Sequence, residues 1–437
     1  MEMREDDALR ALTDMIRIPS VTGSPGEAEI CAYMERLLRE RGIETERVAR
    51  TPERPNLLAA IRARRPTRPP LVLISHVDVV PANAEEWSHD PFGAEQDEGR
   101  VWGRGSLDTK QLTAMELYAF LRLKGREAEL NRDVWFVATI DEEQGSDWGM
   151  GYVRRAKPEL FRGAVVINEG GGFPLKINGG EYMMLTVGEK AVCRARVWAE
   201  GTGCHASAPT SDQAMLKLAE ALRRVFEREG ELDCGSRATQ RDMRSIVGGD
   251  VWDNAVGADI FGYAGQNSIS MRNYAIGVKS NVIPAAAEAR LEFRLLPYAP
   301  QSAVEDFLAR CLEGTEAHWE ILGYEEGFES NRENSDLGSV ADALAAACRR
   351  NGFGGKVLPM LALGRTDGRF FAGTGSVVYG CSPLLMGDSF DVVLPKVHGR
   401  DESILEESFR FGCRVLDETI AEICGAARRE EGQEDAQ

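Results

Sequence analysis

Short apolar strands that alternate with helical patterns constrain the fold of this chain more than any other feature. Residues 71–74 follow two prolines and are all apolar, and the runs 134–140 and 164–167 are predominantly apolar. Strands of this kind are buried on both faces of a sheet. Helical patterns at 25–42 and 107–123 separate them along the chain. The alternation predicts an α/β fold in which a mostly parallel sheet lies between helices.

The pattern changes near residue 185, which indicates a second domain. Residues 184–199 favour extended structure, an amphipathic helix follows at 212–227, and strands follow at 268–273 and 288–296. Extended runs around a helix are typical of a small α+β domain with an antiparallel sheet. A chain of 437 residues is also longer than one hydrophobic core usually supports. We predict a first domain built from residues 1–184 and 300–429, an inserted domain at 185–299, and a disordered acidic tail at 430–437.

The charge of the chain argues against two classes of partner. Lys and Arg number 52 against 70 Asp and Glu, which gives a net charge of −18. An acidic surface repels the phosphates of nucleic acids and anionic lipids, so we expect neither nucleic acid nor a membrane as a partner. The sequence has no secretory signal and no apolar run long enough to cross a membrane. Nine scattered cysteines predict buried free thiols, and together these features indicate a cytoplasmic protein.

Side chains that can bind a metal stand at the ends of the predicted strands. His76 and Asp78 end the first strand, and Glu169 ends the third. In an α/β sheet, ligands gather at the carboxyl ends of the strands. An imidazole that binds a metal also needs an acceptor for its other nitrogen, and Asp78 could supply one. Taken alone, this motif favours an ordinary histidine at the end of a strand over a metal ligand.

Three adjacent carboxylates, Asp141, Glu142 and Glu143, end the second predicted strand. They repel one another strongly unless cations or protons neutralise them. Adjacent residues of an extended chain point in opposite directions, so Glu142 and Glu143 can serve different purposes. One would bind a metal and the other would act as a general base. A solvated acidic loop is the alternative interpretation.

Asp108 and His398 add one ligand each from other segments. Asp108 follows two glycines where the helix at 107–123 begins, so it could cap that helix or bridge two cations. His398 lies just before the last predicted helix, at 402–424. The five candidate ligands combine imidazoles with carboxylates, a set that suits zinc, with cobalt or manganese as possible substitutes. The absence of cysteine ligands favours a catalytic site over a structural one. The five are His76, Asp108, Glu143, Glu169 and His398.

These segments resemble the M20 family of metallopeptidases, which includes aminoacylases, carboxypeptidases and dipeptidases. The similarity runs in family order across nearly the whole chain. The stretch 87–92, Trp-Ser-His-Asp-Pro-Phe, looks most like the aminoacylase and carboxypeptidase branches. The matching segments are 76–81, 87–92, 102–105 with 107–108, 141–143, 168–170, and 398–399 with 402.

The resemblance implies two divalent metal ions and a role for each motif residue. One ion would be held by His76, Asp108 and Glu169, and the other by Asp108, Glu143 and His398. Asp108 would bridge them, and Glu142 would be the general base. His89 has no role in this scheme.

The inserted domain resembles the lid of the family, which commonly also forms a homodimer. The loop 201–209 is similar to the family loop whose histidine, here His205, steadies the oxyanion, although Cys204 replaces the usual glycine. Asn281 and Arg294 match positions that hold the substrate carboxylate. Thr366, Asp367 and Arg369 resemble another loop on the substrate side.

We therefore expect a metal-dependent hydrolase that cleaves an amide or peptide bond in a small substrate bearing a carboxylate. An N-acyl amino acid or a short peptide would be such a substrate. A dipeptidase, a desuccinylase and a hydrolase of ureido compounds are alternatives within the same chemistry. A binding or regulatory protein on the same fold is the alternative outside it, although such a chain should have lost a ligand or the base.

Overall fold

The structure, a computed structural model, describes residues 3–248, 265–276, 281–330 and 335–426. It divides into two compact units. The first comprises Met1–Val187, Asp242–Ala258 and Ser330–Gln437, and the second comprises Gly188–Arg241 and Asp259–Glu329. The second unit contains most of the predicted inserted domain and continues beyond residue 299. The predicted tail at 430–437 lies outside the described residues.

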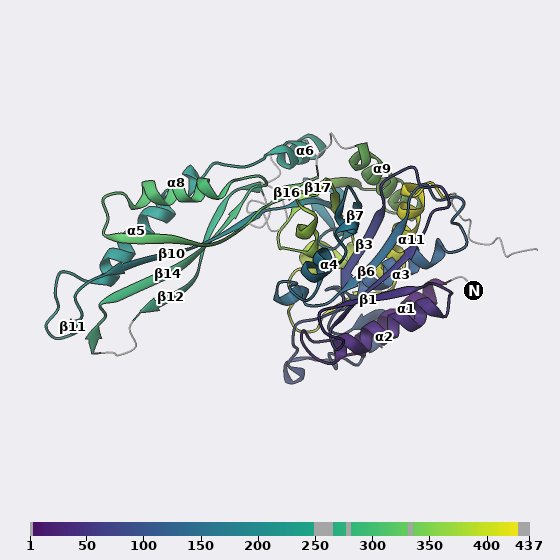
Figure 1. The fold of residues 1–437 in the computed structure, drawn as a ribbon, viewed down its shortest axis with the longest axis horizontal. Helices are drawn as coiled ribbons and strands as arrows, with labels where there is room; N and C mark the ends of the chain where they lie inside the picture. The colour runs from purple at the N-terminus through teal and green to yellow at the C-terminus, as the bar shows by residue number, and fades with distance from the viewer. Residues whose placement is uncertain (1–2, 249–264, 277–280, 331–334, 427–437) are drawn as a thin grey trace, which may run out of the picture. The chain divides into compact units, whose positions relative to one another are not determined.

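The first unit is built around a mixed sheet whose centre is parallel. The order is β1-β2-β6-β3-β7-β18-β9, and the neighbours β6, β3, β7 and β18 run parallel (Figure 1). Antiparallel pairs flank this centre at β1-β2, β2-β6 and β18-β9, while β8 and β17 pair with β9 off the main path. The predicted α/β fold with a mostly parallel sheet is confirmed. The strands are β1 (Thr45–Ala49), β2 (Pro55–Ile61), β3 (Leu71–His76), β6 (Val134–Thr139), β7 (Val165–Asn168), β8 (Pro174–Ile177), β9 (Gly180–Glu189), β17 (Lys356–Ala362) and β18 (Val377–Gly380).

One helix of the first unit is buried on nearly every side. Every residue of α3 (Lys110–Arg122) except the last is buried, because the helix contacts β3 and β6 and also packs against α1 and α11. Phe120 of α3 lies 5.8 Å, between ring centroids, from Phe136 of β6. Helix α3 begins directly after Thr109, so this packing fixes the loop that carries Asp108. The other helices are α1 (Glu5–Ile16), α2 (Gly26–Arg39), α4 (Met150–Ala156), α9 (Ser335–Arg350), α10 (Phe390–Val393) and α11 (Glu406–Ile423).

The last helix begins later than the sequence predicts. Residues 402–405 are not helical: β19 (Ser403–Leu405) pairs antiparallel with β5 (Arg100–Trp102), which also pairs with β4 (Gln96–Asp97). The backbone N–H and C=O groups of Ser403–Leu405 therefore form hydrogen bonds with β5, so they are not available for a helix. The prediction of a helix at 402–424 is correct only from Glu406 onwards.

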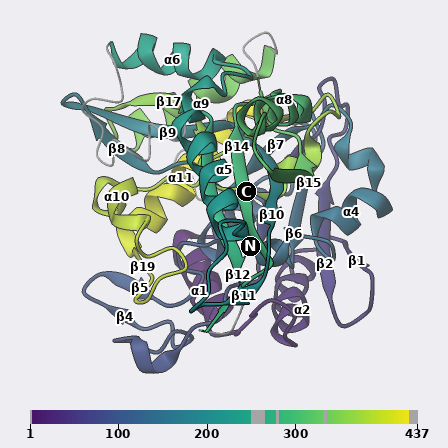
Figure 2. The same ribbon diagram turned by 90° about the vertical axis from the view of Figure 1, so that its left-hand side faces the viewer.

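The second unit has the α+β organisation that the sequence predicts. Its antiparallel sheet has the order β12-β14-β10-β15, and helices α5 and α8 contact one face of it (Figure 2). Leu291 and Phe293 point into this core. The alternate residues of the same strand, Glu292 and Arg294, lie on the other face. The elements are β10 (Ala191–Glu200), β11 (Cys204–His205), α5 (Ala214–Glu227), α6 (Ala238–Val247), β12 (Ser268–Ile276), β13 (Val282–Ile283), β14 (Ala286–Leu295), α8 (Gln301–Leu312), β15 (Ala317–Glu325) and β16 (Phe328–Glu329).

Two further features of the chain are its cysteines and the length of its helices. All nine cysteines are free thiols, and seven of them are buried. Among the helices of the described residues, none combines the length and the apolar character needed to cross a membrane.

The contact between α3 and α11 can be tested at Gly412. A Cβ atom at this position would lie 2.4 Å from the Cε of Met115 and 2.5 Å from the backbone oxygen of Pro383. We expect Gly412→Ala to lower the free energy of unfolding by about 1–3 kcal/mol, because overpacking outweighs the better helix propensity of alanine. Urea denaturation measures the change. Gly338 of α9 is the matched control, since its Cβ would meet nothing within 4 Å, and Gly338→Ala should stabilise slightly. Equal effects of the two substitutions would contradict this packing.

Candidate metal centre

Asp108 lies between two imidazoles, and each of its carboxylate oxygens faces one of them. Oδ1 lies 3.1 Å from Nε2 of His76, and Oδ2 lies 3.0 Å from Nε2 of His398. Glu169 completes the first group, with Oε2 3.6 Å from Nε2 of His76. Glu143 completes the second, with Oε2 3.0 Å from Nε2 of His398. Within each group of three, the potential ligand atoms all lie within 4.8 Å of one another.

The backbone fixes the tautomer of His76. Its Nδ1 donates to the carbonyl oxygen of Asp78 at 2.9 Å, and a carbonyl oxygen can only accept. The proton is therefore on Nδ1 in the neutral ring, which leaves Nε2 as the atom that can bind a metal. The carboxylate of Asp78 lies farther away, 3.6 Å from Nδ1. The acceptor predicted from the sequence is thus present, but it is the main chain of Asp78.

The side chain of Asp78 instead holds the turn that carries the acidic pair. Its carboxylate accepts from the backbone N–H groups of Glu142 at 3.2 Å and Glu143 at 3.4 Å, and from Oγ1 of Thr22 at 2.8 Å. Glu142 and Glu143 lie in a short 3₁₀ turn, Glu142–Gln144. The prediction that they belong to an extended segment was wrong, because the chain turns at Asp141 with φ 67°.

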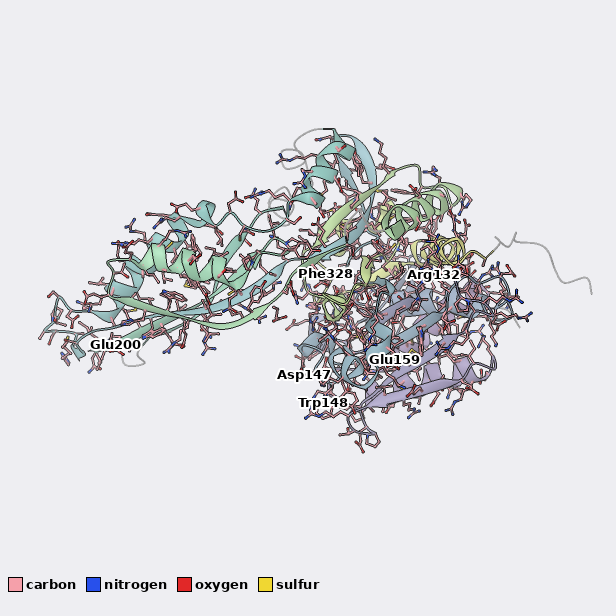
Figure 3. All side chains as sticks on the ribbon, turned by 45° about the horizontal axis from the view of Figure 1, so that its top comes forward. Arg132, Asp147, Trp148, Glu159, Glu200 and Phe328 are labelled. Carbon is pink, nitrogen blue, oxygen red and sulfur yellow. The ribbon has the colours of Figure 1, made fainter. Side chains whose placement is uncertain are left out.

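Asp141 anchors the start of this turn. Its Oδ1 lies 3.0 Å from Nη2 of Arg54, and its Oδ2 accepts from the backbone N–H of Trp148 at 3.0 Å. Arg54 also lies over the ring of Trp148, which Figure 3 labels, and pairs with the buried carboxylate of Glu27. Asp141 is therefore a supporting residue, and its neighbours Glu142 and Glu143 remain for chemistry.

Burial and neighbouring charges shift the pKa values of the candidate ligands. Burial disfavours a charged His76, but Glu169 and Asp108 raise its pKa well above the usual value. Hydrogen bonds to Asp108 and Glu143 raise the pKa of His398 to about 10. Burial raises the pKa of Glu169 to about 7. Against the effect of burial, the two imidazoles lower the pKa of Asp108.

This donor set fits two divalent cations. Each group offers one imidazole nitrogen and two carboxylates, and the shared Asp108 presents a different oxygen to each. Imidazole with carboxylate is a common ligand set for catalytic zinc. Two cations would also neutralise carboxylates that otherwise need raised pKa values or imidazolium partners.

Glu142 lies beside these groups, and Arg369 of the predicted loop at 366–369 contacts it. Burial and the charge of Glu169 raise its pKa well above the usual value, and Nη1 of Arg369 lies 3.4 Å from its Oε1. Asp367 is buried and accepts from Oγ1 of Thr139 at 2.8 Å and from Ser146. Thr366 accepts at Oγ1 from the amide of Asn168 at 2.6 Å. This loop therefore supports the ends of β6 and β7, next to Glu142.

Three further candidates lie in the second unit, which is described by itself. His205 in β11 and Asn281 lie together, because β11 pairs with β13 and the carbonyl oxygen of Asn281 accepts from the N–H of Ala206 at 3.0 Å. Arg294 in β14 donates through Nε to Glu292 at 2.8 Å. His89, in the first unit, stacks on Trp102 and lies 2.9 Å from Glu95, which fits the absence of a predicted role.

A family model described as "Peptidase family M20/M25/M40" matches residues 72–422. The chain belongs to peptidase family M20/M25/M40. Every candidate metal ligand falls inside the matched region.

Individual relatives agree with this membership of the M20 family. Aminoacylase-1 of Mus musculus is 26% identical over 416 residues, which cover 94% of each chain. An M20 family metallo-carboxypeptidase from Sulfolobus solfataricus has a TM-score of 0.73 at 18% identity and covers 96% of this chain and 99% of its own. A Bacillus subtilis protein described as a dinuclear metal binding peptidase of the M20 family has a TM-score of 0.60 at 16% identity and covers 96% and 97%. At these identities the two structures show the shared fold alone.

The family, the relatives and the clustered donors establish the general chemistry. This M20 chain is a metal-dependent hydrolase of amide or peptide bonds.

Two residues without a predicted role also belong to the surroundings of the site. Arg104 and Glu402 stand inside segments that resemble the family, but the resemblance assigns neither of them a role. They form a buried ion pair at 2.5 Å. The sequence signal was their place in the motifs, and their partnership could not be deduced from it.

Metal binding should release protons. At pH 7 His398, with a pKa of about 10, carries a proton that a cation must displace. The apparent zinc affinity should therefore rise with pH from about 6 to 9, since proton competition weakens as the pH approaches that pKa. Titration calorimetry in two buffers of different ionisation enthalpy measures the protons released. An affinity that is independent of pH, with no dependence on the buffer, would contradict the raised pKa of His398.

Proposed function

We propose that this M20 hydrolase cleaves the amide bond of an N-acyl amino acid or short peptide that carries a carboxylate, with two zinc ions. The observation that carries the proposal is the position of Asp108 between two groups of ligands, with Glu142 beside them. The similarity to mouse aminoacylase-1 over 94% of the chain supports an acyl amino acid as the substrate class.

Glu142 is the proposed general base. It lies in the turn next to the ligand Glu143, it is not among the clustered ligands, and burial raises the pKa of its carboxylate, which makes it a stronger base. When bound, the two cations would lower the pKa of a water and polarise the scissile carbonyl. Glu142 then accepts the proton of the attacking water and passes it to the leaving nitrogen.

The second unit supplies the proposed substrate contacts. The imidazole of His205 donates to the oxyanion that forms on the scissile carbonyl, and Asn281, its neighbour across β11 and β13, binds the substrate beside it. Arg294 binds the substrate carboxylate. Its Nε is held by Glu292, so the two terminal nitrogens form the fork that matches a carboxylate.

We also propose a homodimer that forms through the second unit. Strand β12 is at the edge of its sheet, and Met271 and Tyr274 on it are 48% and 64% exposed. Apolar side chains on an unpaired edge are a ready surface for pairing with a second chain. Sedimentation analysis decides between monomer and dimer.

A hydrolysis screen tests the substrate class. N-acyl amino acids, dipeptides, N-succinyl and N-carbamoyl amino acids would each be incubated with zinc, cobalt or manganese. Fastest turnover of N-acyl amino acids supports the proposal. Faster turnover of one of the other three classes would replace the substrate, and no turnover with a full metal complement would favour a binding protein.

The role of Glu142 predicts a separation between metal binding and turnover. Glu142→Gln should keep two zinc ions and lose about 10²–10⁴-fold in kcat, because general-base catalysis contributes that much. Elemental analysis and steady-state kinetics measure the two quantities. Glu143→Gln is the matched control, since it should lose metal as well as activity. Substantial turnover by Glu142→Gln would remove Glu142 as the base.

The role of Arg294 predicts a loss that depends on the substrate carboxylate. Arg294→Lys keeps the charge but not the planar fork, so KM for an N-acyl amino acid should rise by about 10-fold or more. The corresponding amino-acid amide, which lacks the carboxylate, should show a much smaller change. Equal changes for the acid and the amide would mean that the carboxylate is bound elsewhere.

A further inference from the structure

A buried ion pair joins the loops that carry Asp108 and His398. Nη1 of Arg104 lies 2.5 Å from Oε2 of Glu402, and their side chains are 3% and 0% exposed. Arg104 precedes Asp108 by four residues, and Glu402 follows His398 by four. Further hydrogen bonds help to offset the cost of burying two charges.

Glu402 uses its other oxygen on the Asp108 loop. Oε1 accepts from the backbone N–H groups of Gly105 at 3.1 Å, Leu107 at 2.6 Å and Asp108 at 3.1 Å. Three N–H groups directed at one oxygen fix the course of the main chain up to the residue that faces both imidazoles. Glu402 is thus bonded to the backbone of Asp108, while the side chain of Asp108 faces the proposed metals.

Arg104 reaches the other loop. Its Nη2 donates to the carbonyl oxygen of Gly399 at 2.7 Å, one residue after His398. The guanidinium also lies 5.2 Å from the centre of the Trp87 ring. His398 itself is 52% exposed and has a left-handed backbone with φ 58°, so packing alone does not hold it. Its position depends on the loop to which Arg104 is bonded.

We propose that the Arg104–Glu402 ion pair positions Asp108 and His398, which are both ligands of the same proposed metal ion. Glu402 holds the main chain of Asp108, and Arg104 holds the main chain next to His398. The inference rests on the proposed two-metal function. Both residues are positioning residues, since they act on the ligands through each other and through the main chain of the two loops.

The planar fork of arginine is essential to this arrangement. One terminal nitrogen bonds to Glu402 and the other to Gly399. A lysine at position 104 could pair with Glu402, but a single ammonium cannot reproduce the two fixed directions. Arg104→Lys therefore separates the two sets of contacts. Glu402 still holds the Asp108 loop, and the bond to the His398 loop is lost.

Zinc affinity in the full-length protein tests the proposal. The measurements are zinc content after equilibrium dialysis, affinity by competition with a chromophoric chelator, and the melting temperature in EDTA. Glu402→Gln should bind at least one of its zinc ions about 10–100-fold more weakly, the range found when groups that orient metal ligands are changed. Arg104→Lys should weaken one ion and leave the other unchanged.

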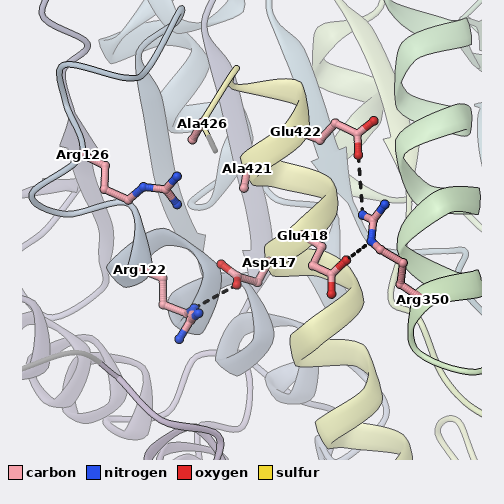
Figure 4. Close-up of a pocket in the computed structure, with 8 residues that line it drawn as sticks. All are labelled: Arg122, Arg126, Arg350, Asp417, Glu418, Ala421, Glu422 and Ala426. Carbon is pink, nitrogen blue, oxygen red and sulfur yellow. Dashed lines mark hydrogen bonds and ion pairs between the residues drawn. The ribbon is translucent and has the colours of Figure 1, made fainter. Parts of the chain in front are cut away.

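The matched control is a second ion pair, which joins the helices α3 and α11 that follow the two loops. Nε of Arg122, at the end of α3, lies 2.9 Å from Oδ2 of Asp417 on α11, and both side chains are largely buried (Figure 4). Helix α3 begins at Lys110, close to Asp108, and α11 begins at Glu406, after the short strand β19 that follows Glu402. Asp417→Asn removes one charge far along these helices from the ligand loops. It should keep two zinc ions at the wild-type affinity while lowering the melting temperature in EDTA.

The outcomes are distinct. Wild-type affinity for two ions in a folded Glu402→Gln overturns the inference, as does an equal loss of affinity in Asp417→Asn, which would indicate a general effect of stability. If Glu402→Gln does not fold, Arg104→Lys decides, and unchanged affinity for both of its ions overturns the inference. If the wild-type protein itself binds fewer than two ions, the proposed function fails, whatever the variants do.

Discussion

The carboxylate of Asp108 lies between imidazoles that come from opposite ends of the chain, and the chemistry of the site depends on this contact. Each oxygen faces one histidine, so a single side chain can serve two cations. Around it, raised pKa values of Glu142 and Glu169 and of the imidazoles reflect a cluster of acids that is too buried to stay charged without positive partners. Two divalent cations would supply those partners.

Much of the first unit binds no ligand but holds the residues that do. Asp78 fixes the turn of Glu142 and Glu143 through their N–H groups, and Arg54 fixes Asp141. The loop at 366–369 is bonded to the ends of β6 and β7. The ligands therefore sit at the end of a strand, as His76 does, or on short loops whose main chain is hydrogen-bonded, which is the support that a precise metal site requires.

The sequence predicted the features that depend on local pattern. Predominantly apolar runs located β3, β6 and β7, and the rule that ligands gather at strand ends placed His76, Glu143 and Glu169 in one region. It could not predict contacts between distant segments. Residues 402–405 form a strand because β5 lies beside them, and the turn at Glu142 exists because Asp78 accepts its N–H groups. For His205, Asn281 and Arg294 no local pattern was informative, and the family resemblance alone singled them out.

The central claim is that Asp108 bridges two bound cations, and anomalous diffraction from zinc-loaded crystals tests it most directly. The account predicts two peaks about 3.5–4 Å apart. His76, Asp108 and Glu169 would coordinate one ion, and Asp108, Glu143 and His398 would coordinate the other. A single peak, or two peaks of which only one contacts Asp108, would contradict it.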